Sequence, residues 1–369
     1  MAKQKHIIDC DRVAERFDGP CGKIVLGIDG FIDEVWQIIE SRAGSGEYSL
    51  YEKMGDFTAA LAGCGDGGFS NEIVRKRRSY GGFTANTGKA VSRLGARPTL
   101  LGMFGHGRID PVFAEFSKGN DLVSVGEPGV SLIYEFTDGK LMLVHMQEIM
   151  GLDWGSLTDA VSEADLKALF GEADIIALGY WSLMPAFDDI AGKVCALLRG
   201  SSRRQRMFFD FADIRKRDKA SLDGTLNQLA VLGKQIPMTL SVNEHEAALL
   251  FSYYGETFSE EPEGADIKTE KVRGVIGIDE LVVHTPHYAS AASASDGSFV
   301  LPQHYCVSPV ITTGAGDNFN GGYLAAALKG LDMPERLAVA NAVTHQYVSL
   351  GHSPDKEEML AELEVCAGL

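Results

Sequence analysis

Short apolar runs alternate with segments of helical period along most of the chain. The apolar runs predict strands at 23–28, 98–103, 174–179, 206–211, 238–242 and 280–285. The helical-period segments predict helices at 85–95, 186–199, 222–235, 243–254, 315–329 and 334–349. Such alternation indicates an α/β fold with a doubly wound, mostly parallel sheet flanked by helices. We expect one domain that spans residues 1–369.

Two regions interrupt the alternation. Residues 131–146, SLIYEFTDGKLMLVHM, read as a hairpin with Asp138-Gly139 at its turn. Residues 47–82 hold short β-like pieces in a glycine-rich loop. These strands could form a plain antiparallel extension of the main sheet or a separate small sheet. Residues 255–270 are polar and predict a loop.

Composition narrows the functional classes. The net charge of −17 argues against binding nucleic acid or an anionic membrane, because either partner needs a basic surface. The six cysteines are scattered without a C-x-x-C pair, which favours a reducing compartment over a zinc site. The first residues lack the apolar core of a signal peptide. We therefore expect a cytoplasmic protein with no membrane segment.

A glycine turn opens the helix predicted at 315–329. Within ITTGAGDNFNGGY, residues 311–323, Gly314, Ala315 and Gly316 precede Asp317 and an apolar run. The unpaired N–H groups and the positive end of the helix dipole would bind an anion such as phosphate. A carboxylate at such a site fits a general base that takes a proton from a hydroxyl. An Asp that only caps the helix is the alternative.

Four segments resemble the ribokinase-like (PfkB) carbohydrate kinases. TTGAGDNFNGGY is similar to the C-terminal signature of that family, and residues 81–105 are similar to its N-terminal signature. NEHE at 243–246 resembles its Asn-x-x-Glu motif, and VLGIDGFIDEV at 25–35 resembles its first strand and substrate Asp. The segments occur in the family's order and span roughly residues 23–351.

The resemblance implies an ATP-dependent sugar kinase that uses Mg²⁺. Asp317 would deprotonate the sugar hydroxyl, and the turn of Gly314, Ala315 and Gly316 would form an anion hole. Gly81, Gly82 and Asn86 would contact the sugar. One of Asp29 and Asp33 would bind substrate, and the sequence does not decide between them.

The resemblance also implies a nucleotide site. Asn243, Glu246, Thr313 and Asn341 would contact the nucleotide, and Glu246 would hold magnesium through water. A capping box of Asn243 and Glu246 can coexist with that role. The family often carries an Asp and an Arg after the strand that ends near Asp210, Asp213 and Arg215, although Arg215 could instead be a surface cation. We interpret His345, on the last predicted helix, as a core or surface histidine rather than a ligand.

In the family, extra strands form a lid over the sugar, so we interpret 47–82 and 131–146 as a small β lid. The hairpin is apolar on both faces, which predicts a homodimer joined through the lids. The chain departs from the family at Ile311, where an Asp often helps to bind potassium, so we expect little potassium activation. It also lacks the usual glycine turn within 284–293 and is longer around 36–80.

Other enzyme classes fit less well. The glycines match neither a Walker A loop nor a Rossmann fingerprint. The remaining alternatives are an ADP-dependent sugar kinase, a nucleoside kinase, and a non-catalytic regulator that binds sugar or nucleotide. The cluster at 75–78, Arg-Lys-Arg-Arg, could bind a phosphosugar or form a solvated strand edge.

Overall fold

A computed structural model describes residues 8–44, 46–201, 203 and 205–367. Its larger sheet has the strand order β14-β13-β12-β11-β10-β9-β1-β5-β6. Neighbours from β6 to β12 are parallel, and β13 and β14 add an antiparallel edge. The strands are β1 (Ile24–Gly27), β5 (Thr99–Gly102), β6 (Asp121–Ser124), β9 (Ile175–Leu178), β10 (Arg206–Asp210), β11 (Met238–Asn243), β12 (Glu280–His284), β13 (Tyr288–Ser293) and β14 (Gly297–Pro302).

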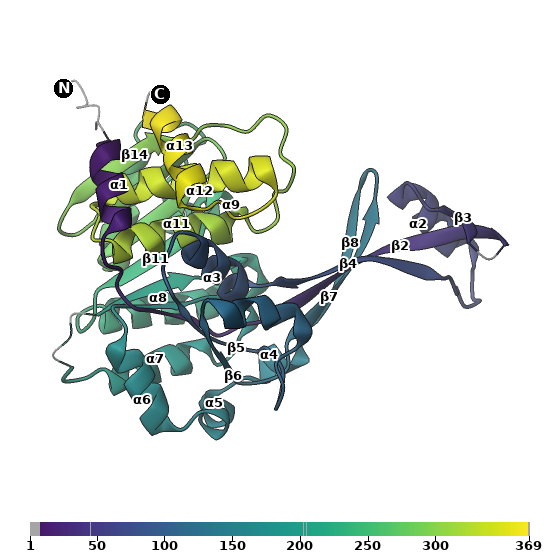
Figure 1. Ribbon diagram of the computed structural model, residues 1–369, viewed down its shortest axis with the longest axis horizontal. Coiled ribbons are helices and arrows are strands. Elements are labelled where there is room, and N and C mark those ends of the chain that lie inside the picture. The colour runs from purple at the N-terminus through teal and green to yellow at the C-terminus, as the bar shows by residue number, and fades with distance from the viewer. Residues whose placement is uncertain (1–7, 45, 202, 204, 368–369) are drawn as a thin grey trace.

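Helices cover both faces of this main sheet (Figure 1), and two large apolar clusters fill the space between the layers. One face carries α5 (Trp154–Ala160), α6 (Glu163–Glu172), α7 (Phe187–Leu197), α8 (Lys219–Leu232), α9 (Glu244–Tyr253) and α10 (Ala265–Ile276). The other carries α3 (Phe83–Arg93), α11 (Ala315–Leu328) and α12 (Met333–Leu350), with α1 (Cys10–Asp18) and α13 (Lys356–Ala367) outside them. The predicted doubly wound, mostly parallel sheet is confirmed.

A second, five-stranded sheet extends away from this body (Figure 1). We call it the projecting sheet. Its long strand β2 pairs with β3 and β4 in the antiparallel sense and with β7 in the parallel sense, and β8 pairs with β7. The strands are β2 (Phe31–Gly44), β3 (Glu47–Leu50), β4 (Ile73–Gly81), β7 (Gly129–Phe136) and β8 (Gly139–His145). The segments predicted as a lid therefore lie in a sheet of their own.

The far end of the projecting sheet has a small core of its own. Helix α2 (Met54–Gly63) places Phe57 against Ile38 of β2 and Phe136 of β7. The sequence analysis did not anticipate this helix, because its two glycines and short length weaken the helical pattern. The core is far smaller than those around the main sheet, so fewer contacts stabilise this end of the molecule.

Several short elements complete the fold. They are α4 (Gln147–Gly151) and the 3-10 turns η1 (Pro111–Lys118), η2 (Trp181–Leu183) and η3 (Ile214–Lys216). The loop predicted over 255–270 is correct only as far as residue 264, because α10 begins at Ala265. No helix within the described ranges is long and apolar enough to cross a bilayer. Part of the N-terminal segment considered for a signal peptide, residues 1–7, lies outside the described residues.

Candidate active site

The carboxyl ends of the central strands and the N-terminus of α11 enclose a cavity of about 500 Å³. Strands β10, β11 and β12 contribute Asp210, Asn243 and His284, and the segment Gly314–Asp317 forms another wall. Parallel strands present their carboxyl ends at one edge of the sheet, which is where open α/β sheets bind ligands. Distant sequence motifs are thus brought to one cavity.

The turn before α11 is fixed by a tyrosine that the sequence analysis missed. Tyr347 of α12 donates a hydrogen bond from its hydroxyl to the Thr313 carbonyl at 2.7 Å. Gly314 has a φ of 87°, and a Cβ atom there would lie 2.8 Å from the Tyr347 hydroxyl. The position therefore requires glycine for both its conformation and its space. Tyr347 lies 34 residues from Thr313, so no local pattern could indicate this contact.

The amides of the turn are not all available to a ligand. The Ala315 N–H already donates to the Thr312 carbonyl at 3.1 Å. Within the described ranges, the N–H groups of Gly316 and Asp317 have no recorded partner. The first N–H groups of a helix lack partners inside the helix, so these two point out of its end together with the positive dipole. The turn can therefore bind an anion through two amides.

Asp317 is held by one side chain and has an unusual acidity. Asn86 of α3 donates from Nδ2 to Asp317 Oδ2 at 2.8 Å, a contact between residues 231 positions apart. Burial, followed by the charge of Asp210, raises the pKa of Asp317 to about 8, while the Asn86 hydrogen bond acts in the opposite direction. A carboxyl group with this pKa can accept and release a proton near neutral pH.

The two aspartates near the first strand have different surroundings. Asp29 is fully buried, and its Oδ1 accepts hydrogen bonds from the Thr84 N–H at 2.8 Å and the Thr84 hydroxyl at 2.5 Å. It therefore caps α3, and burial raises its pKa to about 6. Asp33 lies on β2 and is only partly exposed. Burial raises the pKa of its carboxyl group, while a hydrogen bond with Ser131 and the charges of Arg77 and Lys140 act in the opposite direction.

Gly81 and Gly82 lie directly against these aspartates. A Cβ atom on Gly81 would lie 2.6 Å from Asp33 Oδ2, and one on Gly82 would lie 2.1 Å from Asp29 Oδ2. Gly82 also has a φ of 93°, which few side chains tolerate. The glycine pair thus lets backbone and carboxylates approach each other where β4 ends and α3 begins.

Asn243 and Glu246 form the capping box that the sequence allowed. Asn243 accepts from the Glu246 N–H at 3.1 Å, and Glu246 Oε2 accepts from the Asn243 N–H at 2.9 Å. The other oxygen, Oε1, is buried and unpaired. Burial and the nearby Asp210 raise the pKa of Glu246 well above its usual value. The partly buried Asp210 and the buried Glu246, with its unpaired oxygen, lie at or beside the cavity and fit a magnesium ion held through water.

A lysine of the projecting sheet reaches the turn of the main body. Lys140 on β8 donates from Nζ to Thr313 Oγ1 at 2.9 Å. Of the basic cluster at 75–78, Arg78 is bound by Asp110 in a bidentate pair with both distances at 2.8 Å. Arg77 lies near enough to Asp33 to lower its pKa. The alternating pattern of β8 could have indicated Lys140, but only as a residue on one face of a hairpin.

His284 occupies the region where the family's glycine turn was expected. The chain turns from β12 into β13 at 285–287, and the His284 ring stacks on Phe319 with centroids 4.7 Å apart. A Cβ atom on Gly316 would lie 3.1 Å from His284 Cε1. Burial lowers the pKa of His284 to about 4, so the ring is neutral near pH 7.

Several predicted site residues do not line the cavity. Asn341 is buried in α12 and donates from Nδ2 to the Pro302 carbonyl at 3.2 Å. Asp213 and Arg215 pair with each other at 2.7 Å on the surface. His345 donates a hydrogen bond from Nδ1 to the His304 carbonyl at 2.7 Å. By contrast, Asp210 does line the cavity, where its Oδ2 accepts from Asn320 at 2.6 Å.

Comparisons with known proteins agree with this architecture. The profile of a family described as prokaryotic ketohexokinase matches residues 2–365. A ketohexokinase from Haloferax volcanii is 28% identical over 355 residues, which cover 95% of this chain and 92% of that protein. Ribokinase from Thermotoga maritima has a TM-score of 0.63 at 18% identity and covers 94% of this chain and 100% of its own. For Arabidopsis thaliana ribokinase, solved with ribose and ATP, the TM-score is 0.65 at 18% identity, with 94% and 99% covered.

Proposed function

The chain belongs to the prokaryotic ketohexokinase family, and we propose that this carbohydrate kinase transfers the γ-phosphoryl group of ATP to a hydroxyl of a ketohexose. The observation that carries the proposal is the position of Asp317. Its carboxyl group lies at the N-terminus of α11, hydrogen-bonded to Asn86 at 2.8 Å and lining the 500 Å³ cavity. The printed name of the Haloferax relative supports the choice of a ketohexose.

In the proposed reaction Asp317 takes the proton of the attacking hydroxyl. The sugar oxygen forms a bond to the γ-phosphorus, the bond between that phosphorus and the β–γ bridging oxygen breaks, and ADP leaves with the electron pair. The free N–H groups of Gly316 and Asp317 stabilise the charge on the transferred group. The pKa of about 8 makes Asp317 a competent base just above neutral pH.

The acceptor side is assigned to residues of the projecting sheet and of the start of α3. Asp33 accepts hydrogen bonds from sugar hydroxyls, because its carboxylate is only partly buried, whereas Asp29 is fully buried and its Oδ1 already accepts two hydrogen bonds from Thr84. The backbone of Gly81 and Gly82 approaches the sugar closely. Asn86 has a second role, since its Nδ2 also orients the carboxylate of Asp317.

The donor side is assigned to the cavity. Asn243 and the turn, which line the cavity, contact the phosphates together with the neighbouring Thr313, and Asp210 and Glu246 hold magnesium through water. Bound magnesium would neutralise phosphate charge during transfer. Asn341 acts on the donor side indirectly. It donates a hydrogen bond to the Pro302 carbonyl and so fixes the end of β14, just before the residues that line the cavity.

We assign two roles to the projecting sheet. It covers the sugar, with Lys140 linking it to the turn, and it joins two subunits of a homodimer. The edge strand β8 exposes three consecutive apolar residues, Met142, Leu143 and Val144, an arrangement that free edge strands normally avoid. Light scattering at micromolar concentration, with and without sugar, should give twice the chain mass of 39.8 kDa. A monomer under both conditions would remove the dimer from the proposal.

The function is tested by an acceptor and donor screen. Ketohexoses, aldohexoses, pentoses, nucleosides and phosphosugars are each incubated with ATP or ADP and magnesium, and phosphorus NMR identifies the product. We expect transfer from ATP to a ketohexose and loss of that transfer in Asp317→Asn. Transfer only to nucleosides, or only from ADP, would overturn the substrate or donor assignment.

A further inference from the structure

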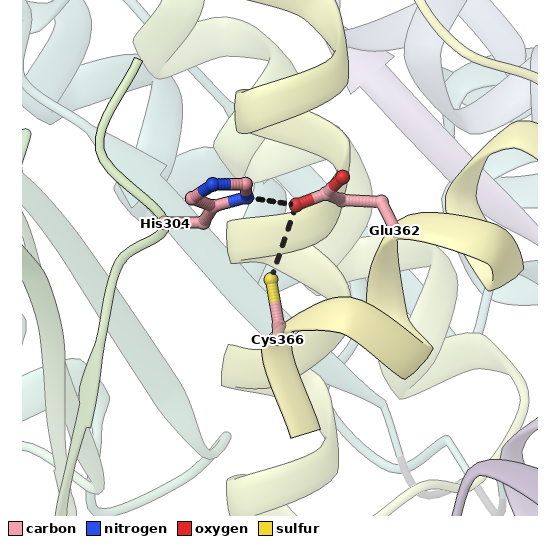
Figure 2. A group of neighbouring side chains, drawn as sticks. All are labelled: His304, Glu362 and Cys366. Atoms are coloured by element: carbon pink, nitrogen blue, oxygen red, sulfur yellow. Dashed lines mark hydrogen bonds and ion pairs between the residues drawn. The ribbon is translucent and has the colours of Figure 1, made fainter. Parts of the chain in front are cut away.

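Three side chains with metal-binding atoms converge beside the donor cavity, away from Asp317. His304 follows β14, whereas Glu362 and Cys366 lie one turn apart on α13, and all three point at a common centre (Figure 2). His304 Nδ1 lies 2.7 Å and Cys366 Sγ 3.4 Å from Glu362 Oε1. The three ligand atoms lie within 4.8 Å of one another.

A second histidine faces the same oxygen. His345 Nε2 lies 3.8 Å from Glu362 Oε1, and its ring stacks on His304 with centroids 3.9 Å apart. The Nδ1 atom of His345 lies 2.7 Å from the His304 carbonyl, which can only accept, so Nδ1 carries the proton. The lone pair of Nε2 is therefore directed away from that carbonyl, and this is the tautomer that binds metals.

The surroundings orient the cluster. Glu362 is buried, with 5% of its surface exposed, and its second oxygen accepts from Gln346 Nε2 at 3.2 Å. A hydrogen-bonded second oxygen is the usual support for a metal-binding carboxylate. Burial and Glu362 raise the pKa of the Cys366 thiol to about 12, so metal binding would displace its proton.

The donor types and spacings select the class of metal. Nitrogen, oxygen and thiolate donors together suit zinc and its neighbours, whereas magnesium and calcium prefer oxygen alone. Zinc bond lengths of about 2.0–2.3 Å place tetrahedral ligands roughly 3.4 Å apart. The Sγ–Oε1 distance of 3.4 Å already matches, and the Nδ1–Oε1 distance of 2.7 Å needs to open by less than about 1 Å.

We propose that His304, Glu362 and Cys366 form a binding site for zinc or a similar borderline divalent ion, with His345 Nε2 as the nearest additional donor. The site connects α12, α13 and the segment after β14. His304 also lines the donor cavity beside Tyr305 and Cys306, so a bound ion would fix one wall of that cavity. The alternative is a cluster of hydrogen bonds that only attaches α13 to the body.

The test uses the full-length protein after treatment with a chelator. Zinc is added, excess is removed by dialysis, and the retained metal is counted by mass spectrometry. Cobalt is titrated in parallel, because its thiolate charge-transfer band and visible spectrum report sulfur ligation and tetrahedral geometry. We expect one ion per chain and a thiolate band.

Variants separate the site from adventitious binding. Cys366→Ser should abolish the cobalt–thiolate band and most zinc retention, while Cys64→Ser, at the residue that follows α2, should leave both unchanged. Gln346→Ala should weaken binding by about 10–100-fold, the usual effect of losing an outer partner. Asp317→Asn should bind zinc like the parent, so this result is independent of the proposed function.

Other outcomes would overturn the proposal of a metal site. Zinc retention no higher than in Cys366→Ser, or a cobalt spectrum without sulfur ligation, would leave only the hydrogen-bonded attachment of α13. Thermal unfolding of each variant without metal provides the check on folding. A folded Cys366→Ser that retains zinc with unchanged affinity would also overturn the proposal.

Discussion

The main sheet and the projecting sheet both supply the proposed site, but they hold their residues differently. On the main-sheet side, Asn86 holds Asp317 through a partly buried hydrogen bond between α3 and α11. On the projecting side, Lys140 makes an exposed contact from an edge strand. Buried contacts restrict motion more strongly than exposed ones. We infer that the main sheet sets the chemical step and the projecting sheet sets substrate affinity.

The substitution with the largest expected effect tests whether the main-sheet side of the site determines the chemical step. Asp317→Asn removes the base with little change in volume, so kcat should fall by about 10²–10⁴-fold while sugar KM changes little. Steady-state kinetics on the substrate identified by the screen measure both values. Asp159→Asn, on the exposed surface of α5, is the matched control and should behave like the parent. Near-normal turnover in Asp317→Asn would remove this residue from the chemical step.

The pH dependence of activity tests the role of Asp317 further. Because the deprotonated carboxylate is the active form and its pKa is raised to about 8, activity should be lost as the pH falls below about 8. We expect log kcat/KM, measured with both substrates below saturation, to fall by about one unit per pH unit well below that pKa. His284, with a pKa of about 4, does not titrate in this window. A flat profile from pH 6 to 8 would contradict the assignment.

Phe57→Ala tests whether the projecting sheet can be destabilised without destabilising the main sheet. Removing a buried Phe usually costs about 3–5 kcal/mol, and this small core has few other members to compensate. Amide exchange should speed up in β3 and the far end of β4 but not in β9 or β10. The KM for the sugar should rise by the same factor by which the fraction of molecules with an ordered projecting sheet falls. Leu61→Ala, exposed on the same helix, is the control; exchange that speeds up equally in both sheets would refute independent behaviour.

Lys140→Met tests the contact between the two regions. The variant loses one exposed hydrogen bond to Thr313, worth about 1 kcal/mol, which corresponds to roughly a fivefold change. We expect this change as a rise in KM and not as a fall in kcat. Lys53→Met, also exposed near the projecting sheet, serves as the comparison. A selective fall in kcat would instead give Lys140 a part in the chemical step.

The smallest expected effect concerns monovalent ions. Ile311 is apolar where related enzymes often carry an Asp, so turnover should change by less than about twofold between sodium and potassium buffers. Magnesium is held constant in this titration. A steep rise with potassium would mean that other oxygen ligands of the turn bind the ion.

The sequence predicted the main sheet well because its strands are buried on both faces and therefore read as apolar runs. The family match confirms the predicted carbohydrate kinase. Residues 36–80 could not be predicted, because polar and charged strands such as β4 carry no core pattern. The different positions of Asp29 and Asp33, and the clamp of Tyr347 on the turn, depend on contacts between distant segments. Those contacts have no local signal.

The glycine pair at 81–82 has a consequence for anyone who redesigns substrate preference. Any side chain there would collide with Asp33 or Asp29, so random libraries that include these codons would consist mostly of inactive members. Selection experiments should therefore keep codons 81 and 82 fixed.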